Sequence, residues 1–164
     1  MSKRGRIYNN FYTPELWAQV NKENKRILDD FLSEYKQRKM SKGTIDGYYH
    51  DLRIIFIYIL KELDNRCILE LNKKNFRGLS LYFTEECGMS PARTNRLKSA
   101  VNSMLTFCEE DDDYDYEINY AKKVKGIPRT RVKDDEDDFF FTFEEFIKVR
   151  DILVEKGRLQ DAVL

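Results

Sequence analysis

Apolar residues recur at steps of three and four positions through most of the first 108 residues. Four segments carry such an apolar stripe: residues 21–39, 41–63, 72–87 and 90–108. This period is that of an α-helix packed on one face, and no segment alternates convincingly with the period of a β-strand. The pattern predicts an all-α fold, a compact four-helix bundle with short connections.

A side chain that can cap a helix stands before each of these segments. The capping residues are Asn21, Ser41, Asn72 and Ser90. Their side-chain oxygens can accept a hydrogen bond from a free backbone N–H of the first turn. Pro91 occupies the first helical position, where proline is favoured, and Gly88 is placed to end the third helix. These local signals support the same four helices.

The two ends of the chain differ from this helical part. The first residues are basic and lack periodicity, and Thr13 then caps a short helix. Near the other end, a charged stretch without periodicity leads to a helix whose capping box pairs Thr142 with Glu145. We predict three parts: an arm with a short helix over residues 1–21, a helical domain over 22–127, and a linker with the truncated start of another domain over 128–164.

Composition favours a folded, cytosolic protein. Hydrophobic residues make up 41% of the chain, which suits a globular core. The three cysteines, Cys67, Cys87 and Cys108, are widely spaced without a CxxC motif, so we expect buried thiols rather than disulfides or metal ligands. No apolar run approaches the roughly 18 residues of a membrane span, and no signal peptide is recognisable. We expect a cytoplasmic location without membrane contact.

Residues that would signal catalysis are scarce. His50 is the only histidine, and a single imidazole on a helix is more often structural or solvent-facing than catalytic. The sequence contains no GxSxG, no HExxH and no glycine-rich phosphate loop. The acidic run Glu109–Asp113 is more typical of a solvated face than of a cation site. We therefore predict no catalytic residue, no metal ion and no cofactor for this chain.

Opposite net charges divide the chain, although its formal charge at pH 7 is zero. Residues 1–108 contain 19 Lys or Arg and 12 Asp or Glu, whereas residues 109–164 contain 10 and 17. Two predicted helices also begin with cations, Lys42 in one and Arg93 with Arg96 in the other. Positive charge at a helix N-terminus opposes the helix dipole, at a cost of roughly a few tenths of a kcal/mol each. A phosphate backbone in front of both helices would reverse that sign, which predicts a DNA-binding surface.

The predicted DNA-contacting residues lie at or near the starts of these two helices. They are Lys39, Lys42, Thr44, Tyr49 and Arg53 on the first helix and its approach, and Arg93, Asn95, Arg96 and Ser99 on the second. Cations would contact phosphates, whereas the hydroxyl and amide side chains, with Arg96, could reach base edges in a major groove. In the N-terminal arm, Arg4 and Arg6 are expected to add backbone or minor-groove contacts. The predicted partner is double-stranded DNA.

The order and spacing of these motifs resemble the core-binding domain of the tyrosine recombinases, the phage-integrase family. The family's first helix carries an FL pair, here Phe31-Leu32. Its second-helix pattern, S-x-x-T-x-x-x-Y-x-x-D-L, is matched by Ser41, Thr44, Tyr48, Asp51 and Leu52. Its fourth-helix pattern, S-x-x-T/R-x-x-R-x-x-S-A, appears here as Ser90, Arg93, Thr94, Arg96, Ser99 and Ala100. The resemblance covers roughly residues 22–128. It departs from the family's Asn-Pro exit, because Asn119 is followed by Tyr120 and a proline comes only at Pro128.

This resemblance implies a SAM-like helical domain that forms one side of a clamp around a recombination core site. It implies that the N-terminal parts of the second and fourth helices face DNA, and that the parent protein acts in DNA integration. The segment TFEEFIKVRDIL looks like the opening of the family's catalytic domain, whose first arginine would fall beyond Leu164. Neither His50 nor any tyrosine matches the catalytic set, so no catalytic residue is carried over. Self-association on DNA is implied for the full-length parent.

Three other functions stay open on the sequence alone. A helical protein-interaction module could use an exposed aromatic face of Tyr49, Tyr58 and Phe139–Phe141. A regulator that binds DNA without any catalytic domain would use the same basic surface. A nuclease could hold Mg²⁺ at the acidic run. DNA binding with a steep salt dependence would favour a DNA-binding domain over the protein-interaction module, because phosphate contacts release counterions.

Overall fold

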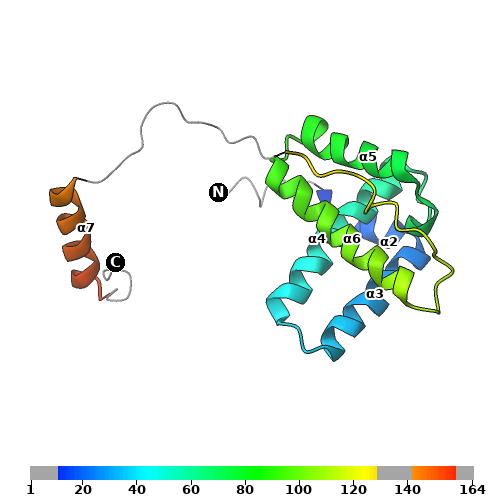
Figure 1. Cartoon of the computed structure of the whole chain (residues 1–164), viewed down its shortest axis with the longest axis horizontal. Helices are drawn as coiled ribbons and strands as arrows, with labels where there is room; N and C mark the ends of the chain where they lie inside the picture. The colour runs from blue at the N-terminus through cyan, green and yellow to red at the C-terminus, as the bar shows by residue number, and fades with distance from the viewer. Residues whose placement is uncertain (1–10, 129–141, 158–164) are drawn as a thin grey trace. The chain divides into compact units, whose positions relative to one another are not determined.

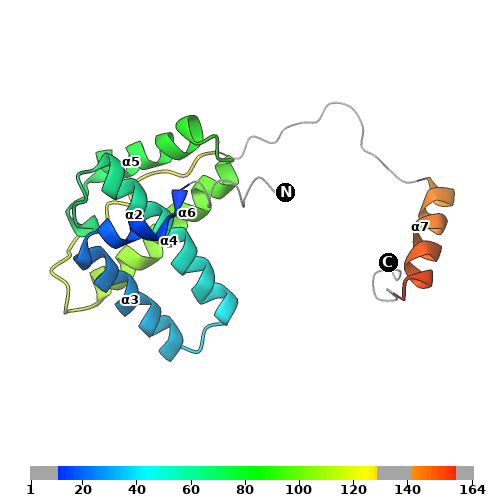
Figure 2. The same ribbon diagram turned by 180° about the vertical axis from the view of Figure 1, so that it is seen from behind.

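The second half of one helix, α4 (Lys42–Glu62), lies at the centre of the helical body (Figures 1 and 2). The computed structural model describes residues 11–128 and 142–157 of the chain. Every residue of α4 from 51 to 59 is buried, on all sides of the helix. A helix that is buried all round must be surrounded by other elements, and this half of α4 therefore forms the centre of the packing.

Several helices pack against α4 along its length. Among them are α2 (Pro14–Gln19), α3 (Lys22–Gln37) and α6 (Pro91–Glu110). A short 3-10 turn, η1 (Ile68–Glu70), follows α4, and α5 (Lys73–Leu81) then packs against α6. The end of α5 continues into a π-helical turn, η2 (Tyr82–Glu86), which also contacts α6. The four predicted helical segments correspond to α3, α4, α5 with η2, and α6.

The residues predicted to cap these helices do so in the structure. Each of Asn21, Ser41, Asn72 and Ser90 accepts a hydrogen bond from a backbone N–H of the following turn. After η2, Gly88 adopts a φ of 60°, in the left-handed region that favours glycine. Local polar signals therefore determine where each helix begins and where the η2 segment ends.

Aromatic packing joins α3 to the first half of α4. The Phe31 ring centroid lies 4.5 Å from that of Tyr35 and 5.3 Å from that of Tyr48. Such pairs contribute about 0.5–1.5 kcal/mol each beyond the burial of their area. The Tyr48 hydroxyl also donates a hydrogen bond to Ser103 Oγ of α6 at 3.3 Å. These contacts hold the start of α4 against both neighbouring helices.

The segment after α6 lies inside the predicted domain of residues 22–127, although no helical pattern was found in it. Its backbone is not helical, yet five of its side chains are buried: Tyr114, Tyr116, Asn119, Ala121 and Val124. The Tyr114 hydroxyl donates to Asp30 Oδ2 of α3 at 2.6 Å, and burial, together with this bond, raises the pKa of Tyr114 above its ordinary value. Residues 111–128, here called the exit segment, are therefore part of the folded body.

A second unit of the chain contains α7 (Phe143–Glu155). Its predicted capping box is present, because Thr142 Oγ1 accepts from the Glu145 N–H and Glu145 Oε2 accepts from the Thr142 N–H. Across residues 11–128 and 142–157 the structure consists of helices and loops without strands, which confirms the all-α prediction. Within the same ranges, no helix combines the length and the hydrophobicity required to cross a membrane.

Candidate nucleic-acid interface

The starts of α4 and α6 line one surface hollow of about 430 Å³. From α4 it is lined by Ser41, Gly43, Thr44 and Gly47, and from α6 by Arg96 and Ser99. Three of the predicted contact residues, Thr44, Arg96 and Ser99, are thereby brought together. The two helix starts that carry unfavourable cations in the sequence thus face the same space.

A buried carboxylate, Asp51, lies at the base of this hollow. It is 4% exposed and pairs with both arginines of α6. Asp51 Oδ1 lies 2.6 Å from Arg93 Nη1, and Asp51 Oδ2 accepts a hydrogen bond from Arg96 Nε at 2.9 Å. A buried carboxylate requires such partners, because desolvation of an unpaired charge is costly. The cations at the start of α6 therefore have an internal anion, which the sequence interpretation did not include.

The two arginines differ in how far they reach solvent. The side chain of Arg93 is 23% exposed and that of Arg96 is 60% exposed. One carboxylate shared by two guanidinium groups leaves one net positive charge in the triad. Because Arg96 is the more exposed partner, this charge is presented mainly at the hollow.

Glycine at position 47 allows Arg96 to lie close to α4. A Cβ atom on Gly47 would be 3.2 Å from Arg96 Nη2, which is tighter than ordinary van der Waals contact. Gly47 and Asp51 are one helical turn apart and so lie on the same face of α4. The helix thus provides both the room for the guanidinium and its carboxylate partner.

The start of α4 has no acidic residue in its first turn. Ser41 Oγ accepts from the Thr44 N–H at 3.2 Å and lies 2.9 Å from the Thr44 hydroxyl. The cations Lys39 and Lys42 are exposed beside this start, with Lys39 in the left-handed region at a φ of 54°. An uncompensated helix start with adjacent cations favours an anionic partner.

The structure argues against a direct DNA contact by Arg53. Its guanidinium carbon lies 3.4 Å from the Tyr12 ring centroid, 4.7 Å from that of Tyr49 and 5.1 Å from that of Trp17. Only 5% of Arg53 is exposed. The predicted contact residue Tyr49 is half-buried in the same stack. The sequence interpretation treated Arg53 as a surface cation, whereas aromatic rings enclose it.

The side chain of Asn95 is also used inside the molecule. Its Nδ2 donates to the Ile127 carbonyl at 2.8 Å, and its Oδ1 accepts from the Ile127 N–H at 2.9 Å. Nearby, Lys98 donates to the Val124 carbonyl, and burial lowers the pKa of Lys98. Both amide atoms of Asn95, Nδ2 and Oδ1, thus bond the exit segment, which argues against the predicted reading of a base edge.

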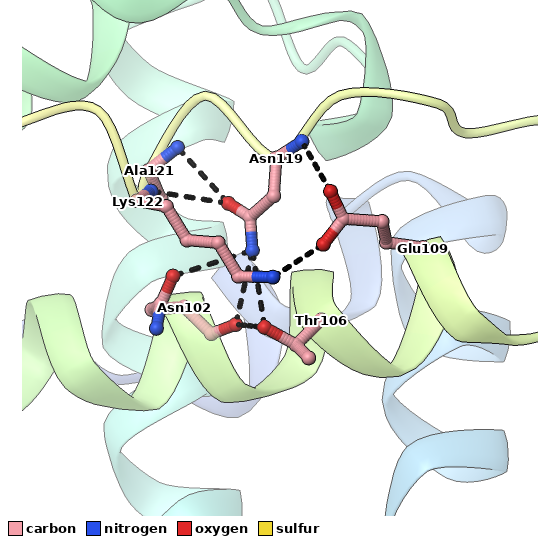
Figure 3. Close-up of polar contacts among 6 residues, drawn as sticks. All are labelled: Asn102, Thr106, Glu109, Asn119, Ala121 and Lys122. Atoms are coloured by element: carbon pink, nitrogen blue, oxygen red, sulfur yellow. Dashed lines mark hydrogen bonds and ion pairs between the residues drawn. The ribbon is translucent and has the colours of Figure 1, made fainter.

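Asn119 fixes the exit segment to the second half of α6, as Figure 3 shows. It is 2% exposed, and its Nδ2 donates to the Asn102 carbonyl, to Asn102 Oδ1 and to Thr106 Oγ1, each at 3.2 Å. Its Oδ1 accepts from the N–H groups of Ala121 and Lys122. Together with the Asn95 contacts, this network runs the segment antiparallel to α6, so that residue 127 lies near the start of that helix (Figure 1).

Other sequence-based candidates have different positions. Tyr58, predicted on an exposed aromatic face, is 4% exposed and packs 4.9 Å from Tyr82 between ring centroids. That part of the face is therefore buried in the core. Phe139–Phe141, Arg4 and Arg6 lie outside the described residues. Over residues 11–128 and 142–157, no cluster of three or more His, Cys, Asp or Glu side chains could hold a metal ion.

Comparison with known proteins shows a similarity to a prophage protein. The chain is 26% identical over 136 residues to the SPbeta prophage-derived recombinase-like protein YomM of Bacillus subtilis (strain 168). The aligned region covers 77% of this chain and 40% of that protein, so the chain corresponds to less than half of its relative's length. No family model matches the chain, and no solved structure matches it. The similarity points to a relationship with recombinases.

Proposed function

We propose that the helical body binds duplex DNA as the core-binding domain of a tyrosine recombinase. In this proposal the starts of α4 and α6 face the duplex. The similarity to a recombinase-like prophage protein supports a role in recombination. The motifs of α4 and α6 support the tyrosine-recombinase class, because their spacing resembles that family.

One observation carries the proposal. Arg96 is held at a hollow that also contains the start of α4, and its side chain is 60% exposed. The hollow therefore combines a guanidinium, free N–H groups of a helix start and the hydroxyls of Thr44 and Ser99. All of these groups donate hydrogen bonds to phosphate, and the charge of the site is positive.

We expect two kinds of DNA contact: phosphate contacts that position the duplex and base-edge contacts that read its sequence. Lys39, Lys42 and the start of α4 would bind phosphates and so fix the orientation of the duplex. Arg96 and Ser99 lie in the first half of α6, from which their side chains can reach a groove edge. Arg93 is assigned to Asp51 rather than to DNA, and Arg53 and Asn95 are assigned to the fold.

The path of the exit segment suits this orientation. Asn95 holds Ile127 beside the start of α6, so the chain leaves the helical body close to the proposed DNA surface. We propose that strand cleavage and rejoining in the parent protein are performed by residues outside 11–128.

Salt dependence of DNA binding tests this function with the whole 164-residue chain. We expect binding of a labelled duplex, measured by fluorescence anisotropy, to weaken steeply as salt increases. Each phosphate contact contributes a slope of about −0.9 to the plot of log K against log salt, so three or more contacts give a slope beyond about −2.5. Absence of binding at low salt, or a slope near zero, would contradict the proposal and favour a protein-interaction module.

A further inference from the structure

The carboxylate beneath the hollow has a role of its own, which rests on the proposed function. We propose that Asp51 is a positioning residue that holds the Arg96 guanidinium over Gly47 with its terminal amino groups directed to DNA. Arg93 supplies the second partner that the buried carboxylate needs. Asp51 contacts no DNA in this arrangement and acts through Arg96.

The division of the carboxylate oxygens supports this assignment. Asp51 uses Oδ1 for Arg93 Nη1 and Oδ2 for Arg96 Nε. A guanidinium has five N–H donors, and Nε carries one of them. The pair with Asp51 therefore uses one donor of Arg96 and leaves the four terminal N–H donors out of this contact. These terminal groups form the planar fork that binds phosphate or a guanine edge.

Burial identifies which arginine acts as the structural partner. Asp51 is 4% exposed, so its charge needs neutralisation inside the protein. Arg93 is the less exposed of the two arginines, at 23% against 60% for Arg96. Arg93 is therefore the principal counterion of Asp51. Arg96 adds a net positive charge that Asp51 orients without burying.

Gly47 contributes the second element of the positioning. A Cβ at residue 47 would lie 3.2 Å from Arg96 Nη2, so the guanidinium rests where a larger side chain would stand. Gly47 and Asp51 lie one turn apart on α4, and both line the hollow with Arg96. One face of α4 thus carries both the Asp51 carboxylate that binds Arg96 and the glycine that leaves room for its guanidinium.

The substitution Asp51→Asn distinguishes positioning from simple electrostatics because the two predict opposite signs. Removing a negative charge makes the surface more positive, so electrostatics alone predicts tighter DNA binding. Loss of positioning predicts weaker binding, because Arg96 must then be ordered when DNA binds. We expect an affinity about tenfold weaker, which is within the usual coupling between contacting residues.

A double-mutant cycle measures whether this effect passes through Arg96. We expect Asp51→Asn to weaken duplex binding in the wild-type background and to change it less than twofold in an Arg96→Ala background. Tighter or unchanged binding of Asp51→Asn would overturn the proposal. Equal weakening in both backgrounds would also overturn it, because Asp51 would then act only through the fold. Thermal unfolding of each variant establishes that the folded protein is being compared.

Gly47→Leu provides a second variant that leaves the Asp51–Arg93 pair in place. Its side chain occupies the position of the Arg96 guanidinium, and leucine is tolerated in a helix. We expect weaker binding than wild type, and no further loss when Gly47→Leu is combined with Arg96→Ala. An unchanged affinity for Gly47→Leu would count against the proposal even if Asp51→Asn did not fold.

A measurement without DNA separates this inference from the proposed function. In ¹⁵N relaxation of the free protein, the Arg96 Nε–H signal should show an ordered side chain that becomes mobile in Asp51→Asn. A mobile Arg96 in the wild-type protein would overturn the positioning role whether or not DNA binds. If Arg96 is ordered by Asp51 but duplex DNA is not bound, the ordering role is upheld and the proposed function fails.

Discussion

Asn95 and Ile127 form a reciprocal pair, in which the amide of Asn95 donates to the Ile127 carbonyl and accepts from the Ile127 N–H. The pair joins the first turns of α6 to the end of the exit segment. A Cβ on the neighbouring Gly126 would lie 3.1 Å from Asn95 Oδ1, so the backbone approaches this amide closely. A polar side chain that sequence reasoning assigned to DNA is thus part of the fold.

Asn95→Ala should therefore affect stability more than DNA binding. Loss of both hydrogen bonds leaves two partly buried backbone groups without their partner, at a cost of about 1–3 kcal/mol in the free energy of unfolding. Urea denaturation measures this change in stability. Fluorescence anisotropy with duplex DNA should give a Kd within about twofold of wild type, well below the tenfold change that corresponds to about 1.4 kcal/mol. A large loss of DNA affinity with an unchanged free energy of unfolding would show that Asn95 contacts DNA instead.

Asn119→Ala should be among the more destabilising substitutions in the exit segment. The side chain is buried and bridges α6 to the segment through both of its amide atoms (Figure 3). We expect a loss of about 3 kcal/mol, typical of a broken buried hydrogen-bond network.

The matched control for Asn119 is Lys122→Ala. Lys122 pairs with Glu109 in the same network, but its side chain is 45% exposed. Exposed ion pairs contribute about 0–1 kcal/mol, so this variant should remain close to wild type in urea denaturation. Equal losses for the two variants would show that the buried amide has no special role.

Arg53→Met should destabilise the packing of α2 against α4 without changing DNA affinity. The guanidinium stacks on Tyr12 and lies near Tyr49 and Trp17, and such desolvated cation–π contacts contribute about 2 kcal/mol. Methionine keeps a flexible apolar side chain but lacks the charge. Thermal unfolding and duplex anisotropy should both be measured, because weaker DNA binding by a fully folded variant would argue that Arg53 is part of the interface.

The helices were predictable because their signals are local. Caps such as Ser41 and Ser90 lie within three residues of the N–H groups that they bind, and the apolar stripes repeat within single helices. The packing of the exit segment was not predicted, because its buried residues have irregular spacing and distant partners, as between Tyr114 and Asp30, which are 84 residues apart.

The candidate surface was located in part from sequence. The charge pattern shared by the two helix starts predicted that both face the same partner. The pairing of Asp51 with Arg93 and Arg96 was not predicted, because it joins residues more than 40 positions apart in the sequence. The burial of Arg53 had a sequence signal, since it stands directly before the apolar run IIFIYIL. A cation that adjoins such a run is better assigned to aromatic or acidic partners than to the surface.

The affinity of Arg96→Ala and Lys42→Ala for duplex DNA tests the proposed interface most directly. The control is Arg77→Ala, an exposed cation on α5, a helix that contributes no residue to the hollow. At about 150 mM salt, Arg96→Ala should bind about tenfold more weakly than wild type, and Lys42→Ala should reduce the salt slope by about 1. Arg77→Ala should match wild type. If Arg96→Ala and Lys42→Ala bind as tightly as Arg77→Ala, the starts of α4 and α6 are not the DNA-binding surface.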